Sequence, residues 1–358
     1  MILCSSPVPT GFCFCCDKVF SIIDGHCSLS VSNSRRIAIL GKTGVGKSSL
    51  ANTILGEQLF RIGHSVNSET IKCQAETKPV NGGNITLIDT PGFFDTDRSE
   101  EELKSEILRC ITEFALGPHA FLIVLKVERF TEHEQAIIDK IHQYFSEEVL
   151  QYASVLFTHG DQLPEGQTIE DFVHDNRRVK DLVEKCGGRC HVVDNKYWKN
   201  NQEEYRNNQV QVKELLKTID KMVEANEGRC YTNEMLQAVE ERIIQEVELI
   251  RQTAGNKSEG EIREEAKENV FKLLWTKLAG IASGALWGAL LGLMEMASDI
   301  ITALTQPGGA GMRGATVQRA VGVALRGAMQ GAITGHNASE GADSPGEAAK
   351  KAGDAVMK

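Results

Sequence analysis

The sequence predicts an α/β fold: a doubly wound, mostly parallel sheet with helices on both faces, followed by an α-helical C-terminal extension. From Arg36 to about Glu227, short runs rich in aliphatic and β-branched residues alternate with helix-length segments. This alternation is typical of parallel strands joined by crossover helices. A glycine-rich loop joins the first such run to the first helix, and beyond Glu227 the apolar residues recur at helical spacing only.

The strands and helices follow from the spacing of apolar residues. Five apolar runs are expected as strands, at residues 36–40, 85–89, 120–127, 153–157 and 190–194. The segments between them carry apolar residues at helical spacing, and helices are expected at residues 47–56, 100–115, 132–145 and 169–186.

The chain divides into five parts by composition. Residues 1–34 are a Cys-rich leader that we expect to be disordered, and residues 35–228 form the α/β domain. Residues 229–270 are a charged amphipathic helical extension. Its apolar stripe is expected to pack on the domain or on a partner, with a long coiled coil as the alternative; the stripe consists of Met235, Val239, Ile243, Ile244, Val247 and Ile250. Residues 271–336 are rich in Gly and Ala, and residues 337–358 are expected to be a disordered tail.

Net charge and cysteine content limit the cellular compartments and the classes of partner that the sequence suits. The net charge of −10 argues against a nucleic-acid-binding surface. Five of the ten cysteines lie in the first 27 residues, without the paired spacing of a zinc site. We expect reduced thiols in a cytoplasmic protein; lipidation of Cys15 or Cys16 is the alternative.

The glycine-rich loop has the spacing GxxxxGK[ST] between a strand and a helix. In this arrangement backbone N–H groups turn inward around phosphate oxygens, and the helix N-terminus favours negative charge. The lysine reaches the β- and γ-phosphates and the serine hydroxyl ligates Mg²⁺. The predicted nucleotide-binding residues of the loop are Gly41, Lys42, Thr43, Gly44, Val45, Gly46, Lys47, Ser48 and Ser49.

Two further segments have the composition expected around Mg²⁺ and a γ-phosphate. The run LIDTPG ends a strand with Asp89, which can hold the Mg²⁺ water shell, and with Gly92, whose N–H can sense the γ-phosphate. Thr70 lies in a polar segment between the two motifs and is a candidate mobile switch residue. The predicted metal ligands are therefore Ser48, Thr70 and Asp89.

Base recognition is assigned to the ends of two later strands. Thr158 and Asp161 follow the strand at 153–157, and a carboxylate there accepts from N1–H and the 2-amino group of guanine, a pattern that adenine lacks. Asn195, after the strand at 190–194, is a second candidate contact to the base. The alternative for Asp161 is an ordinary turn residue.

Taken together, these motifs resemble the GTPases of immunity-associated proteins (the GIMAP family, with an AIG-type G domain). The resemblance covers residues 36 to about 250 and rests on GKTGVGKSSLANTILGE, SETIKCQ, DTPGFFDT, GPHAFLIVLKVERFTEHEQ, LFTHGDQL and RCHVVDNK. His159 stands where the family places a residue able to lie against the base.

The resemblance implies a septin-related P-loop GTPase that binds GTP and GDP with Mg²⁺ and dimerises through its nucleotide face, with higher oligomers also open. It also implies an immune-cell role and, in several members, membrane attachment. Phe93 follows DTPG where a glutamine would orient water, so a catalytic charge must come from elsewhere. Arg129 is the catalytic candidate, acting across the dimer as an arginine finger; the alternative is a solvated residue at a helix start.

The segment 271–336 reads as a helical hairpin with small-residue faces. Gly280, Gly284, Gly288 and Gly292 repeat every four residues, and a second glycine-spaced segment contains Arg319 and Arg326, which suit a lipid-spanning helix poorly. The hairpin has three possible roles: packing inside the protein, contact with an intracellular membrane, or self-assembly.

The leading function is a GTP-dependent dimerising switch or scaffold with slow GTP hydrolysis. The alternatives are a scaffold without meaningful hydrolysis, an ATPase and a membrane-perturbing effector whose hairpin is gated by the G domain.

Overall fold

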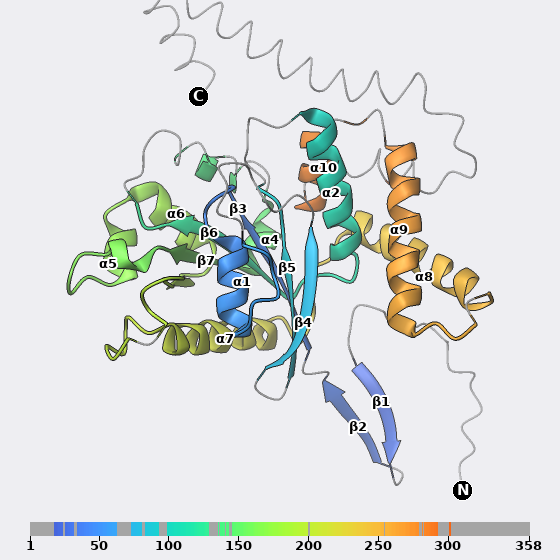
Figure 1. The fold of residues 1–358 in the computed structure, drawn as a ribbon, viewed down its shortest axis with the longest axis horizontal. Coiled ribbons are helices and arrows are strands. Elements are labelled where there is room, and N and C mark those ends of the chain that lie inside the picture. Colours follow the sequence, from blue (N-terminus) through green and yellow to red (C-terminus); the bar gives the residue numbers. More distant parts are fainter. Residues whose placement is uncertain are drawn as a thin grey trace, which may run out of the picture.

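The computed structural model confirms a mostly parallel sheet with helices on both faces (Figure 1). It describes residues 18–23, 26–31, 34–62, 73–80, 83–92, 99–128, 135, 137–139, 141–142, 145–199, 201–253, 255–278, 281, 283–292 and 301. The main sheet has the strand order β4-β5-β3-β6-β7-β8, and all neighbouring strands are parallel except β4 and β5. The strands are β3 (Ser34–Gly41), β4 (Gln74–Val80), β5 (Gly83–Asp89), β6 (Ala120–Lys126), β7 (Ala153–Thr158) and β8 (Cys190–Val192).

The two faces of the sheet support two separate apolar cores. Because successive side chains of a strand point to opposite faces, Ile37 and Ile39 of β3 lie in the core shared with α1 (Lys47–Leu55) and α7 (Asn208–Ala225). Ala38 and Leu40 lie in the larger core on the opposite face. That core includes side chains of α2 (Glu100–Phe114), α4 (Glu147–Gln151), α5 (Ile169–His174), α6 (Arg177–Lys185) and the helices after residue 233.

Three strands, β1, β2 and β4, were not anticipated from the sequence. β4 pairs antiparallel with β5 at the edge of the sheet, and its sequence QAETKPV is half exposed, so it lacks the apolar run of a central strand. β1 (Lys18–Ile23) and β2 (His26–Val31) form a separate antiparallel two-stranded sheet. These residues lie inside the segment 1–34 that we expected to be a disordered leader, and most of the rest of that segment lies outside the described residues.

The single helix expected at 169–186 is wrong: the segment forms α5 and α6. The Asn176 side chain accepts hydrogen bonds from the backbone N–H groups of Arg178 and Val179, and so starts a second helix. α7 was also not anticipated. The helix expected at 132–145 is described only in part, and the residues of it that are helical include Gln135 and Ile137–Asp139.

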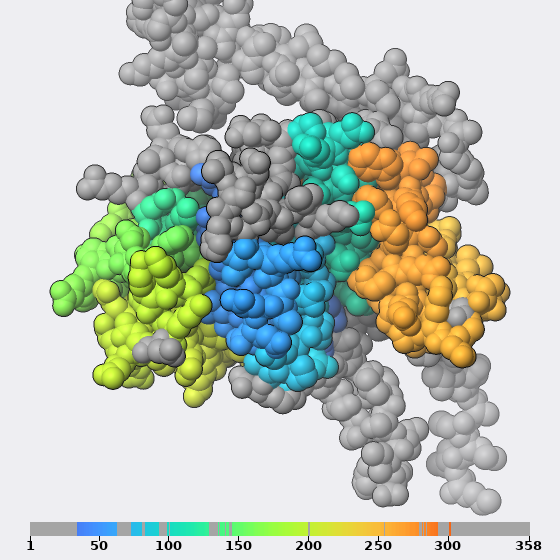
Figure 2. All heavy atoms as spheres, in the orientation of Figure 1, coloured from blue at the N-terminus to red at the C-terminus, as the bar shows by residue number. Residues whose placement is uncertain are grey.

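The extension after residue 233 packs on the α/β domain, as its apolar stripe indicated. α8 (Glu234–Arg251) buries Met235, Val239, Ile243 and Ile250 of the stripe. α9 (Glu259–Lys277) begins at a capping box on Ser258 and runs through residue 271, so the change of composition there is not a structural boundary. Figure 2 shows these yellow-to-orange helices against the teal α2.

Ion pairs fasten α9 to both of its neighbours. Arg263 donates to both carboxylate oxygens of Glu240 on α8, at 3.0 and 2.8 Å. Lys267 donates to Glu113 on α2 at 2.9 Å, with both side chains less than a fifth exposed. The charge of Glu113 and hydrogen bonds to Glu113 and Glu264 outweigh burial and raise the pKa of Lys267.

The first glycine-spaced segment supplies a short buried helix. α10 (Ser283–Leu290) packs mainly on α2, and its Leu286, Trp287, Ala289 and Leu290 are buried. The residue before α8 satisfies the last carbonyls of α10: Asn233 Nδ2 donates to Ala289 O at 2.9 Å and to Leu290 O at 3.1 Å. This part of the segment is therefore packed internally.

The rest of the predicted hairpin, residues 293–300 and 302–336, and the predicted tail at 337–358 lie outside the described residues. Among the helices that the structure does describe, none combines the length and the apolar character needed to cross a membrane.

Leu286→Ala is expected to lower the free energy of unfolding by about 2–5 kcal/mol, because Leu286 is fully buried on α10, which packs on α2, and its truncation leaves a cavity. Urea unfolding measures the change. Leu249→Ala is the matched control, since Leu249 is 55% exposed on α8 and should change stability by less than about 0.5 kcal/mol. Equal effects of the two substitutions would show that α10 does not belong to the cooperative core.

Candidate functional site

The phosphate loop connects β3 to α1 with backbone conformations that need glycine. Gly44 and Gly46 have φ of 72° and 93°, in the left-handed region. A Cβ on Gly41 would lie 2.6 Å from the carbonyl oxygen of Val124 on β6, so a side chain there displaces backbone. Gly46 also precedes α1 without any side-chain cap, which leaves the helix N-terminus to face the loop.

Lys47 lies along the inside of this loop. Its Nζ donates to Gly41 O at 2.9 Å and to Lys42 O at 3.0 Å, and the side chain is buried. An ammonium held among loop carbonyls is placed beside the position that a β- or γ-phosphate takes in such loops.

Ser48 and Asp89 meet beneath the loop. Ser48 Oγ donates to Asp89 Oδ2 at 2.5 Å, which brings two of the three predicted metal ligands together. Burial raises the pKa of Asp89, although the charge of Lys47 and the Ser48 hydroxyl act in the opposite direction. The second oxygen of Asp89, Oδ1, is buried and accepts no hydrogen bond from any residue that the structure describes. A hydroxyl beside a buried carboxylate with an unsatisfied oxygen is a donor set that suits Mg²⁺.

Thr158 and Asn195 tie the ends of β7 and β8 to the phosphate loop and α1. Thr158 Oγ1 donates to Val45 O at 2.7 Å from a fully buried position. Asn195 Oδ1 accepts from Thr53 Oγ1 of α1 at 2.9 Å, and a Cβ on Gly46 would lie 3.2 Å from Asn195 Nδ2. The polar groups of both predicted base contacts thus bind other parts of the protein, which fixes the loops on which they lie.

His159 and Asp161 lie on the loop that follows β7. His159 is exposed with φ of 59°, a left-handed conformation that is uncommon for a residue with a side chain. Asp161 Oδ2 accepts from Gln162 Nε2 at 2.7 Å. Burial and a hydrogen bond with Asp194 raise the pKa of Asp161.

Sequence reasoning missed two residues of this region, Asp194 and Asn208. Both are buried, and they hydrogen-bond to each other. Asp194 comes directly before the predicted Asn195, but HVVD reads as the end of a strand. Asn208 is the first residue of α7, a helix that was not anticipated.

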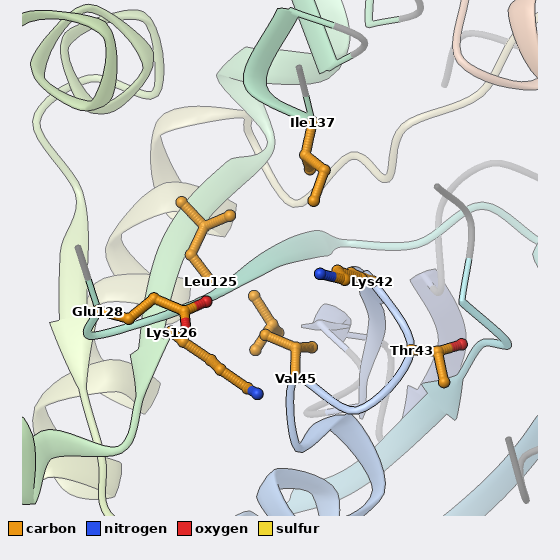
Figure 3. A pocket seen from close by; sticks show the side chains of 8 residues that line it. Lys42, Thr43, Val45, Leu125, Lys126, Glu128 and Ile137 are labelled. Carbon is orange, nitrogen blue, oxygen red and sulfur yellow. The ribbon is translucent and has the colours of Figure 1, made fainter. Parts of the chain in front are cut away.

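A small pocket opens on the β6 side of the phosphate loop (Figure 3). Its labelled lining combines the aliphatic side chains of Val45, Leu125 and Ile137 with the charged side chains of Lys42, Lys126 and Glu128. The base-reading candidates are not part of this lining, so the pocket is separate from the expected base position.

The remaining predicted residues divide into two groups. Gly92 is buried just after β5, and its assignment to the γ-phosphate stays a prediction. Thr70 and Arg129 lie outside the described residues, and their assignments stay predictions.

Comparison with known proteins identifies relatives of this chain. Residues 35–250 match the model of the AIG1 family. Immune-associated nucleotide-binding protein 9 of Arabidopsis thaliana is 32% identical over 238 residues, 63% of this chain and 68% of that protein. GTPase IMAP family member 8 of Mus musculus is 31% identical over 196 residues, 53% of this chain and 28% of that protein. The crystal structure of Toc33 from Arabidopsis thaliana in complex with GDP and Mg²⁺ is 23% identical, with a TM-score of 0.42, over 55% of this chain and 86% of that chain.

Proposed function

Because the chain belongs to the AIG1 family, we propose that it is a guanine-nucleotide-binding protein that takes GTP and GDP with Mg²⁺. The observation that carries the proposal is the arrangement under the phosphate loop: Lys47 within the loop and the Ser48–Asp89 pair below it. Its relatives named nucleotide-binding proteins and GTPase IMAP support the same assignment.

Each part of the site has a separate task in binding. The loop 41–48 surrounds the phosphates with backbone N–H groups, and Lys47 exchanges its loop carbonyls for phosphate oxygens. Ser48 and Asp89 hold Mg²⁺, which neutralises phosphate charge when bound. Asp161 accepts hydrogen bonds from N1–H and the 2-amino group of guanine, which disfavours adenine and therefore an ATPase.

We propose slow hydrolysis of GTP to GDP and phosphate in a homodimer formed through the nucleotide face. Arg129 supplies the transition-state charge from the partner subunit, and Thr70 closes over the γ-phosphate and Mg²⁺. The competing function is a scaffold in which bound GTP is not turned over, and the measurement on Arg129 described in the Discussion separates the two.

The proposal has three further parts. They are, in order, an immune-cell function, a cytoplasmic location, and contact of residues 271–336 with an intracellular membrane. The relatives' names support the first. For the third, the packing of α10 on α2 means that α10 itself contacts a membrane only after leaving the domain.

Isothermal titration of the full chain with GDP, GTP and ATP, each with and without Mg²⁺, tests the proposal. Stoichiometric binding of GDP and GTP with no competition from ATP is the expected result. Equal affinities for ATP and GTP would replace the guanine assignment with that of a general nucleotide-binding protein.

Lys47→Met is expected to weaken GDP binding about 100-fold, because a charge-assisted contact to phosphate is lost and the methionine fills the same volume. Titration calorimetry measures the affinity. Lys221→Met, on an exposed position of α7, is the matched control and should leave the affinity unchanged. Undiminished binding by Lys47→Met would remove the phosphate loop from the site.

A further inference from the structure

We propose that Asp194 is a positioning residue for base recognition, one that holds the peptide N–H of Asp161 and so fixes the direction of the Asp161 carboxylate. The inference rests on the proposed guanine-nucleotide binding and adds to it the residue that sets its base specificity. Asp194 lies two residues after β8, and Asp161 lies in a short 3-10 turn, Gly160–Gln162, in the loop after β7.

The contacts of Asp194 connect the two loops that carry the base-reading candidates. Oδ2 accepts from the backbone N–H of Asp161 at 3.4 Å. Oδ1 accepts from the backbone N–H groups of Lys196 at 2.9 Å and Tyr197 at 2.5 Å. One carboxylate therefore organises the turn after Asn195 and reaches across to the neighbouring loop.

Asp194 is itself held from α7, where the Asn208 side chain pairs with both backbone groups of Asp194. Asp194 N donates to Asn208 Oδ1 at 3.1 Å, and Asn208 Nδ2 donates to Asp194 O at 2.6 Å. Asp194 is 2% exposed and Asn208 is 5% exposed, so water does not compete for these bonds. The anchor is rigid because it is buried and its backbone is paired on both sides.

The loop after β7 is shaped to rest on the turn that Asp194 organises. Gly160 N donates to Val193 O at 3.0 Å, and a Cβ on Gly160 would lie 2.5 Å from the ring of Trp198. Only glycine allows this approach to a buried tryptophan. Asp161, the next residue, therefore has its main chain fixed on one side by Gly160 and on the other by Asp194.

The two carboxyl groups are also close enough to share a hydrogen bond, which links base binding to pH. Burial is the main cause of the raised pKa of Asp161, and the hydrogen bond with Asp194 raises this pKa further. A hydrogen bond from Gln162 and the charge of His159 lower it. In Asp194, backbone N–H donors such as that of Tyr197 outweigh burial and lower the pKa.

Accepting from guanine requires ionised Asp161, so the affinity for GDP is full above the raised pKa of Asp161 and falls as pH falls through it. The neighbouring cation Lys196 stays charged throughout this range.

The test compares GDP with inosine 5′-diphosphate, which lacks the 2-amino group that Asp161 reads. In Asp194→Asn the side chain keeps one oxygen for Lys196 and Tyr197 but turns an NH₂ group toward the Asp161 N–H. We expect GDP affinity to fall about tenfold, and the preference for GDP over inosine diphosphate to fall with it, because the better-matched base loses more. The pH below which GDP affinity falls should also move to a lower value, because the variant lacks the Asp194 carboxylate that raises the pKa of Asp161.

Two further variants complete the design. Asn208→Asp keeps the acceptor for Asp194 N but loses the donor to Asp194 O, and should reduce the same preference by a smaller factor. Asp175→Asn makes the same chemical change at an exposed site and should alter neither the preference nor the pH profile.

The outcomes separate the inference from the function on which it rests. Wild-type protein that binds GDP, with an Asp194→Asn variant that keeps the wild-type preference and pH profile, overturns the inference alone. A general loss of structure lowers both affinities equally and leaves their ratio unchanged, which also counts against it. Wild-type protein that binds no GDP overturns both proposals.

Discussion

Asp161→Asn is expected to lower the affinity for GDP by about 1,000-fold and to create affinity for xanthosine 5′-diphosphate. A carboxylate accepts two hydrogen bonds from the guanine edge, and hydrogen bonds to charged groups contribute about 1.5–3 kcal/mol each. The asparagine amide presents a donor where the 2-amino group of guanine also donates, so the two repel. Xanthine carries a carbonyl at that position and accepts the new donor.

Titration of wild-type and variant protein with both diphosphates measures this exchange of preference. Asp175→Asn, on an exposed turn, is the control for the chemical change itself and should bind as the wild type does. If Asp161→Asn kept the wild-type affinity for GDP, Asp161 would be an ordinary turn residue, and guanine recognition would have to come from elsewhere on the two loops.

Arg129→Ala is expected to reduce single-turnover GTP hydrolysis about 1,000-fold, because an arginine finger contributes about 10³–10⁵ to the rate of such reactions. Since the arginine is proposed to act on the partner subunit's nucleotide, the wild-type rate per protein should rise with protein concentration and reach a plateau. Nucleotide affinity should be unchanged in the variant, which separates catalysis from binding.

Arg229→Ala is the matched control for Arg129, since Arg229 is an exposed arginine paired only with nearby Glu227 among the ion pairs of the described residues. A wild-type rate that does not depend on concentration and is unaffected by Arg129→Ala would exclude the finger. No measurable turnover in either protein, with normal GTP binding, would favour the scaffold without hydrolysis.

The central strands and the phosphate loop were predictable because their signals are local. β3, β6 and β7 are buried on both faces and therefore form continuous apolar runs, and the loop before α1 carries its glycines at fixed spacing. β4 was missed because an exposed edge strand such as QAETKPV has no apolar run. The break between α5 and α6 was missed because Asn176 caps a helix inside a segment whose apolar spacing continues across it.

The residues of the candidate site that lie in sequence motifs could be predicted, but the residues that hold their loops in place could not. Lys47, Ser48 and Asp89 lie in recognisable motifs, and the structure brings them together. Asp194 and Asn208 are joined by hydrogen bonds between residues 14 positions apart, one just after β8 and the other at the start of α7, which was not anticipated. Such a contact depends on how β8 and α7 meet, which no local pattern encodes.

Because α9 and α10 pack on α2, they belong to the same packed unit as the α/β domain. Residues 35–250 match the family, yet α2 is covered by α9, whose Lys267 binds Glu113, and by α10. A polypeptide cut at residue 250 would present the bare apolar side of α2 to water, and self-association through that surface is the expected fate. We therefore expect the smallest piece that unfolds in one cooperative step to extend to Gly292, about forty residues beyond the end of the family match.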